Sequence, residues 1–205
     1  MMHGMEIIRY LKKHPELSIR MSALWSLVYG VFNLSLSLTR KSYWYLAIGA
    51  YFLILGTGRL TAAAVKGKLK TKLRMTAGMI LFLAAVIAGL MYMTIHEVVY
   101  PEGNRMIVIG QAAFVFTMLG AAVYNMILSI RRKDRTVIMA RNLSMTAAVG
   151  AVLSLQRTML GTFGNAADTF NIQIGAYTGA GAVIILFLLA YDLLRESKKK
   201  IGESE

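Results

Sequence analysis

The stretch VIMARNLSMTAAVGAVLSLQRTMLG, residues 137–161, decides how this chain folds. It is long and apolar enough to cross a bilayer as a helix, which takes about 20 residues. Five of its polar or small residues recur at intervals of four, four, four and three, which places them on one helical face: Asn142, Thr146, Gly150, Ser154 and Arg157. A guanidinium or amide facing hydrocarbon costs several kcal/mol unless it is partnered. We therefore expect this stripe to face other helices or a wet cavity.

The composition indicates an all-α integral membrane protein. Hydrophobic residues make up 57% of the 205 residues, and the mean hydropathy is +0.56, whereas soluble domains are about 45–50% apolar. The apolar residues fall in runs of bilayer length, which predict six transmembrane helices at residues 21–39, 43–65, 75–95, 106–130, 137–161 and 172–194. Residues 21–194 would thus form one transmembrane domain. Residues 1–20 form a basic segment before it, either a short interfacial helix ending at Pro15 or a frayed tail, and residues 195–205 form a charged tail.

The distribution of basic residues predicts the orientation. With the N-terminus in the cytoplasm, 18 Lys and Arg residues fall on the cytoplasmic side, counting Arg141 at the start of the fifth span, and three fall in external segments. Two others, Arg59 and Arg157, remain within spans. Because cytoplasmic loops carry an excess of Lys and Arg, both termini are expected inside the cell, with the chain a multi-pass protein of the cell membrane. The same clustering between apolar runs argues against a nucleic-acid partner, despite the net charge of +13.

Aligning the sequence with itself at shifts of 92 to 99 residues predicts an internal repeat. Asn33 with its Ser at i+4 lies over Asn125 at a shift of 92 residues, and Arg59 lies over Arg157 at a shift of 98. Spans one to three would then be duplicated as spans four to six, inverted in the membrane because three is odd, as in many transporters. The alternatives are three two-helix hairpins, or chance matches between helices of similar composition.

Six residues are candidates for binding a polar or anionic solute: Arg157, Gln156, Asn142, Asn33, Asn125 and Arg59. An arginine offers a planar fork of donors to a carboxylate or phosphate, and an amide offers two donors and one acceptor oxygen. Each residue also has a structural interpretation. Arg59 lies toward the inner face, where an arginine commonly snorkels to the head groups, and the amides can bond between helices.

Small residues predict close helix contacts. Gly175 and Gly179 form a G-x-x-x-G pattern in the sixth span. This pattern serves packing within the bundle or docking against a second copy or a partner membrane protein.

Several chemistries are excluded by absent residue types. The chain has no Cys and three His, and the middle of its spans contains no Asp or Glu. Carboxylates within the membrane are the usual means of proton or sodium coupling, so a coupled pump is disfavoured. No nucleophile has a base to activate it, so we predict no catalytic residue, no metal site and no cofactor.

The leading functional hypothesis is a passive permease or channel for a polar or anionic solute, in contact with the lipid bilayer. The alternative is a non-catalytic membrane subunit or sensor that packs against a partner membrane protein. An enzyme or flippase acting on lipid head groups is a third hypothesis. In a permease, the candidate polar residues should converge on a shared cavity, whereas in an interaction subunit they should pair with one another.

Overall fold

The computed structural model describes residues 15–64, 68–97, 104–132, 134–164 and 169–198. Within these ranges the chain forms six helices and no strand: α2 (Pro15–Arg40), α3 (Tyr43–Ala64), α4 (Leu69–Glu97), α5 (Arg105–Arg132), α6 (Arg135–Phe163) and α7 (Thr169–Lys198). All six are long and apolar enough to cross a membrane, which confirms the predicted six-span, all-α membrane architecture. The interfacial helix predicted before Pro15, and the end of the charged tail after residue 198, lie outside the described residues.

Five of the six helices extend beyond their predicted spans, because polar residues continue them, whereas α3 (Tyr43–Ala64) falls one residue short of its predicted end. α4 begins at Leu69, six residues before its predicted span, and the added turns contain Lys70 and Lys72, both of a residue type that favours helix. The start of α6 is capped by Asp134, whose side chain accepts a hydrogen bond from the Thr136 backbone N–H at 2.9 Å. Such a cap satisfies one of the donors that a helix start leaves open.

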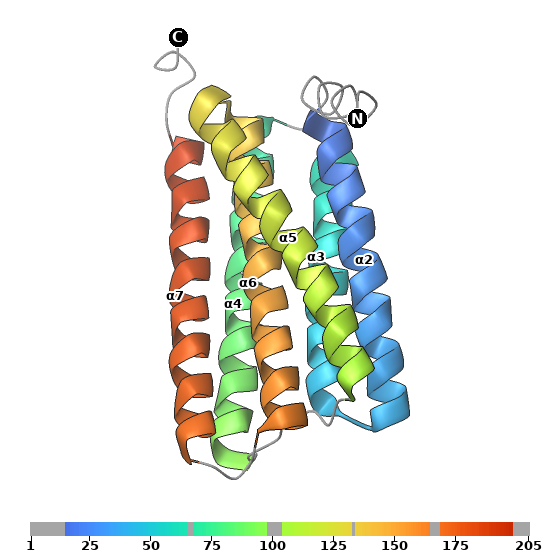
Figure 1. The fold of residues 1–205 in the computed structure, drawn as a ribbon. Helices are drawn as coiled ribbons and strands as arrows, with labels where there is room; N and C mark the ends of the chain where they lie inside the picture. Colours follow the sequence, from blue (N-terminus) through green and yellow to red (C-terminus); the bar gives the residue numbers. More distant parts are fainter. Residues whose placement is uncertain (1–14, 65–67, 98–103, 133, 165–168, 199–205) are drawn as a thin grey trace.

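The helix with the polar stripe, α6, is the central element of the bundle. The most extensive contacts join α2 to α3, α4 to α7, and α5 to α6, and α6 also contacts every other helix. In Figure 1, α2 and α3 stand on one side, α4 and α7 on the other, and α6 lies between them with α5 crossing in front. Two thirds (67%) of the apolar span of α6 is buried, the largest share among the described helices.

Glycines allow α2 and α3 to approach closely. A Cβ added at Gly49 would lie 2.8 Å from the Leu34 side chain, and one at Gly56 would lie 2.7 Å from that of Leu27. The leucines of α2 therefore fill the space above glycines of α3. In lipid, where apolar burial gives no driving force between helices, such van der Waals packing is a main source of association.

The G-x-x-x-G pattern of α7 is directed into the bundle. Gly175 and Gly179 are both buried. A Cβ at Gly175 would lie 2.5 Å from Cζ of Arg157 on α6, and one at Gly179 would lie 2.0 Å from Sδ of Met91 on α4. The close contacts that these glycines permit are therefore intramolecular, which is the first of the two predicted roles.

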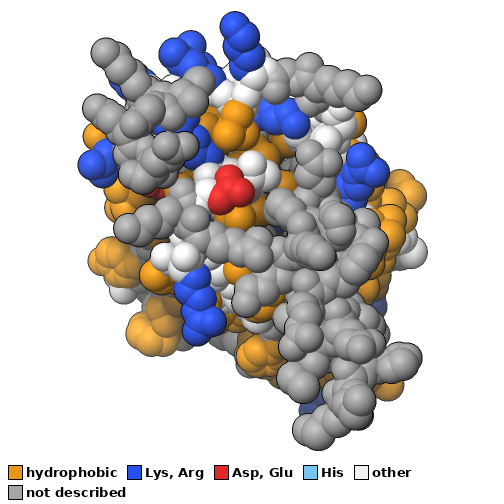
Figure 2. All heavy atoms as spheres, turned by 90° about the horizontal axis from the view of Figure 1, so that it is seen from above, with side chains coloured by type: hydrophobic (Ala, Val, Ile, Leu, Met, Phe, Trp, Pro, Cys, Tyr) orange, Lys and Arg blue, Asp and Glu red, His pale blue; other side chains and the backbone are white. Residues whose placement is uncertain are grey.

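α2 starts and α7 ends at the same end of the bundle (Figure 1), and most of the basic residues belong to helix ends on that side. Seen from that side, Lys and Arg side chains surround the rim (Figure 2). We call this the basic end, defined by Arg20, Lys68, Lys70, Lys72, Arg74, Arg131, Arg135, Arg195 and Lys198. The opposite end holds Arg40, Lys41 and Arg105. The charge asymmetry seen in the sequence is thus an asymmetry between the two ends of the folded bundle.

Candidate functional site

The polar stripe of α6 faces the protein interior, as predicted. All five of its members are buried: Asn142, Thr146, Gly150, Ser154 and Arg157. They contact different helices along its length, because Asn142 bonds to α7, Thr146 to α3 and Ser154 to α2. Asn142 and Arg157 are about 22 Å apart along α6, at 1.5 Å per residue. The stripe is therefore a seam through the bundle, and its two ends belong to separate polar regions.

Arg59 of α3 is the centre of a buried polar region on the side of the basic end. Its side chain is 1% exposed. Nη1 donates to the backbone O of Ser22 at 2.9 Å, to Oγ of Ser22 at 2.5 Å and to Oγ of Ser26 at 2.8 Å, while Nη2 donates to the backbone O of Leu143 at 2.5 Å. Nε is buried and has no hydrogen-bond partner in the described part of the chain. The structure thus differs from the snorkelling interpretation, because α2 and α6 supply acceptors inside the bundle.

The charge of Arg59 lacks a counter-charge among the described side chains. Every acceptor that it contacts is a carbonyl or hydroxyl oxygen. Burying an ion costs several kcal/mol even after relaxation, and neutral acceptors offset only part of that cost. The site therefore favours any anion that can reach the guanidinium.

A small polar cavity lies beside Arg59. Its volume is about 10 Å³, room for about one water molecule. It is lined by residues of α2, α3, α5 and α6: Ile19, Ser22, Arg59, Asn125, Ala140, Leu143 and Ser144. Nδ2 of Asn125 donates to Oγ of Ser144 at 2.7 Å. Two of the six candidate residues, Arg59 and Asn125, thus line one cavity that offers guanidinium, amide and hydroxyl groups.

Asn142 belongs to a separate cluster between α6 and α7. Its Oδ1 accepts from Nε of Arg141 at 3.0 Å, and its Nδ2 donates to Oδ2 of Asp192 at 3.1 Å and to the backbone O of Leu189 at 3.2 Å. Arg141 and Asp192 also form an ion pair. Sequence reasoning missed this pair because it counted Arg141 with the cytoplasmic basic residues, and Asp192, near the end of the predicted span 172–194, was not among its candidate residues. The sequence did contain a signal for this pair, because Arg141 and Asp192 carry opposite charges and both fall near the same predicted membrane face.

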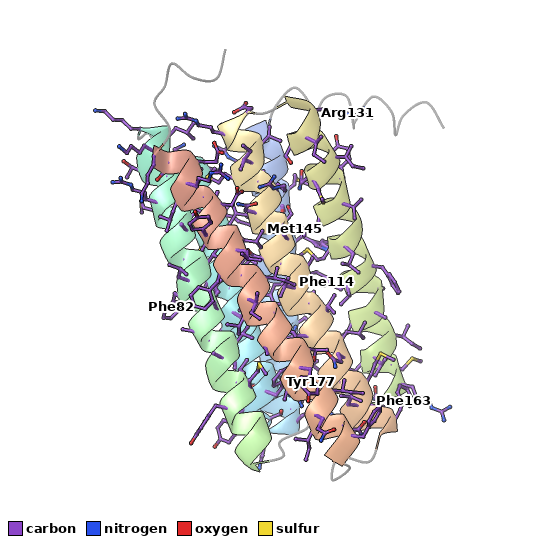
Figure 3. All side chains as sticks on the ribbon, turned by 90° about the vertical axis from the view of Figure 1, so that its left-hand side faces the viewer. Phe82, Phe114, Arg131, Met145, Phe163 and Tyr177 are labelled. Carbon is purple, nitrogen blue, oxygen red and sulfur yellow. The ribbon has the colours of Figure 1, made fainter. Side chains whose placement is uncertain are left out.

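An aromatic layer lies between α2, α3 and α5, and we define it as Tyr29, Phe52 and Phe114. The rings of Tyr29 and Phe114 are stacked with centroids 3.7 Å apart, and Phe52 meets Tyr29 edge-on at 4.7 Å. Phe114 lies at mid-height of the bundle (Figure 3). The layer joins α2, α3 and α5. Sequence reasoning did not find it, because aromatic residues within apolar spans carry no periodic signal.

Two buried amides lie beyond the aromatic layer, away from the basic end. Asn33 follows Tyr29 by one turn of α2, and Gln111 precedes Phe114 by about one turn of α5; since the two helices run in opposite directions, both lie on the same side of the stacked rings. Nδ2 of Asn33 donates to the backbone O of Tyr29 at 2.9 Å. Within the described chain, Oδ1 of Asn33 and both amide atoms of Gln111 are buried without a hydrogen-bond partner. Buried polar atoms of this kind are rare and commonly mark a functional group or an unseen water or ion.

Arg157 and Gln156 point to different sides of α6. Arg157 is buried, and its Cζ lies 5.7 Å from the ring centroid of Trp44 on α3, a cation–π geometry. Gln156 is half-buried and lines an apolar groove of about 420 Å³ between α5, α6 and α7. The six candidate residues therefore occupy several places along the bundle, and only Arg59 and Asn125 line the small polar cavity.

The described residues contain no group of three His, Asp or Glu side chains placed to hold a metal ion. The functional groups that the fold brings together are guanidinium, amide and hydroxyl groups, which bind anions or polar solutes by hydrogen bonds. Comparison of the chain with protein-family models, with curated proteins and with solved structures found no match.

Proposed function

We propose that this protein is a small passive permease for a small anion, and that Arg59 is its principal anion-binding group. The observation that carries this proposal is the buried guanidinium of Arg59, whose described acceptors are all neutral, beside a polar cavity. An anion entering this cavity supplies the missing counter-charge. The size of the cavity, about one water, favours a small monovalent ion over a large metabolite.

The proposed anion path follows the buried polar groups through the bundle. It begins at the basic end, passes the Arg59 cavity, crosses the aromatic layer and reaches the amides of Asn33 and Gln111. The aromatic layer closes this path in the conformation described, so transport requires Phe114 or Tyr29 to move. The middle of the spans lacks Asp and Glu, which removes repulsion of an anion and leaves no carboxylate to couple its movement to protons or sodium.

We also propose that the basic end faces the cytoplasm and that the two halves of the bundle are an inverted repeat in the cell membrane. The excess of Lys and Arg at the basic end supports the orientation in which this end faces the cytoplasm. The packing of α2 along α3 and of α5 along α6 supports the repeat. Cysteine introduced at exposed Asn104 should react with an impermeant thiol reagent added to intact cells, and cysteine at exposed Lys68 should not. Labelling at Lys68 alone would reverse the orientation.

The permease is tested by anion efflux from proteoliposomes. The vesicles are loaded with potassium chloride, and valinomycin sets their membrane potential by carrying potassium. Vesicles that contain the wild-type protein should release chloride faster than vesicles without protein. Arg59→Gln should lower this rate by about tenfold or more, because a hydrogen bond to a charged group contributes about 1.5–3 kcal/mol. Arg59→Lys should keep part of the rate, since it retains the charge and loses the planar fork.

Arg74→Gln is the matched control for charge, because Arg74 is exposed on α4 at the basic end. It should leave chloride efflux near the wild-type rate. Nitrate and acetate, tested in the same way, define the size limit. Wild-type efflux equal to that of protein-free vesicles for all three anions would contradict the permease.

A second candidate function is a non-catalytic membrane subunit. It is favoured by the polar side chains that pair with one another, as in the ion pair of Arg141 with Asp192 and the bond from Tyr51 to the Thr146 carbonyl at 2.8 Å. This function predicts that Arg59→Gln changes the stability of the protein and that the wild type carries no anion flux. The efflux experiment therefore separates the two candidates.

A further inference from the structure

The groove between α3 and α4 at the basic end has a polarity gradient along its length. Its volume is about 300 Å³. Near the basic end it is lined by Thr61 and Ala62 of α3 and by Lys72 of α4, and deeper in the bundle by Ile54 and Met79. From Ala62 to Ile54 the groove runs about 12 Å along α3, at 1.5 Å per residue. One cationic group thus lies at its mouth and apolar side chains at its depth.

The groove opens toward lipid. Met75 and Thr61 are exposed at its edges. Phe82, about one turn beyond Met79 on α4, points away from the bundle (Figure 3) and is 57% exposed. Gly58 sets the depth of the groove, because a Cβ there would lie 1.9 Å from Sδ of Met79. The floor of the groove is therefore the contact between α3 and α4 itself.

The hydroxyl group of Thr61 is already used within its own helix. Its Oγ1 donates to the backbone O of Thr57 at 3.1 Å and to that of Gly58 at 2.9 Å. Thr57 likewise donates to the backbone O of Leu53 at 2.8 Å. These threonines consequently present no spare donor to a ligand, and the ammonium of Lys72 is the donor at the mouth of the groove.

We propose that this groove binds an anionic phospholipid, with its phosphate at Lys72 and one acyl chain lying between α3 and α4. The charge of Lys72 complements the phosphate, and Lys68, one helical turn before Lys72, adds positive charge at the same end of α4. Basic pockets between transmembrane helices near the cytoplasmic surface suit anionic head groups for this reason. The apolar depth complements a hydrocarbon chain, which a soluble anion or a polar peptide does not provide. The site is separate from the cavity beside Arg59.

The test measures retained lipid after reconstitution of the full-length protein in nanodiscs of equal amounts of phosphatidylglycerol and phosphatidylcholine. Native mass spectrometry of the released wild-type protein should show that it retains more phosphatidylglycerol than phosphatidylcholine. Lys72→Gln should lower that preference about fivefold, the effect of one basic residue at a membrane surface. Arg74→Gln should lower it less, because Arg74 does not line the groove. Equal retention of the two lipids by the wild type would overturn the proposal.

A second pair of variants separates the groove from the general surface charge. Thr61→Trp fills the mouth of the groove and should lower phosphatidylglycerol retention with all charges unchanged. Thr117→Trp is its control, since Thr117 is an exposed threonine on α5 with the same bond to its own helix, to the backbone O of Ala113 at 2.9 Å. Equal retention by the two tryptophan variants would refute the groove as the site. Displacement of the lipid by glycerol 3-phosphate alone would refute the role of the acyl chain.

Discussion

Replacing Gly150 by alanine should destabilise the protein through its contact with Tyr51. Gly150 lies in the middle of the α6 stripe, and a Cβ there would lie 2.5 Å from Cε1 and 2.9 Å from Cζ of Tyr51. The ring cannot retreat freely, because it is fully buried and its hydroxyl donates to the Thr146 carbonyl at 2.8 Å. The added methyl group must therefore shift a ring that is tied to the same helix.

The size of the effect follows from three contributions. Overpacking a filled core costs about 1–3 kcal/mol, and loss of the tyrosine bond adds about 0.6–1.7 kcal/mol. The higher helix propensity of alanine offsets about 1 kcal/mol. The free energy of unfolding should thus fall by about 1–4 kcal/mol, and a central value of about 2 kcal/mol lowers Tm by about 4–8 °C in a chain of this length.

The assay is thermal unfolding of the purified protein in detergent, with two comparisons. Gly120→Ala is the control, because nothing lies within 4 Å of a Cβ at Gly120 on α5, and its Tm should equal or exceed that of the wild type. In a Tyr51→Leu background, Gly150→Ala should no longer lower Tm, since the ring that it displaces is gone. An unchanged Tm for Gly150→Ala in the wild-type background would refute the close packing of Tyr51 on α3 against Gly150 on α6.

Three further predictions concern the remaining polar and aromatic groups. Phe114→Ala should open the aromatic layer and raise chloride efflux from proteoliposomes, whereas Phe116→Ala, on the lipid-exposed face of the same helix, should leave it unchanged; equal rates would contradict the barrier. Asp192→Asn should lower the free energy of unfolding by about 1–2 kcal/mol, a value between those for exposed and buried ion pairs. Adding Arg141→Gln to this variant should restore part of the lost stability, and a double-mutant cycle measures that recovery. Arg157→Gln should lower chloride efflux more than Arg157→Lys, because lysine keeps the charge, and equal efflux by both variants would exclude a role for that charge.

The sequence predicted the membrane class, the number of spans and the inward face of the central helix. These depend on local properties of the chain, because bilayer thickness sets the length of an apolar run and helical periodicity sets which residues share a face. The stripe from Asn142 to Arg157 was predicted in this way and is buried. The role of the G-x-x-x-G glycines, Gly175 and Gly179, was left open, since spacing does not say which helix lies opposite.

The tertiary structure decided which polar groups meet. Arg59 meets serines of α2 and a carbonyl of α6, Arg141 meets Asp192, and Tyr29 stacks on Phe114. These contacts join residues 33 to 85 positions apart in the chain. They depend on helix rotation and depth, which the packing of whole helices sets and which no local pattern contains. For this reason the sequence supplied the candidate residues, while only the fold separated the Arg59 cavity from the Asn142 cluster and brought Tyr29, Phe52 and Phe114 together in an aromatic layer.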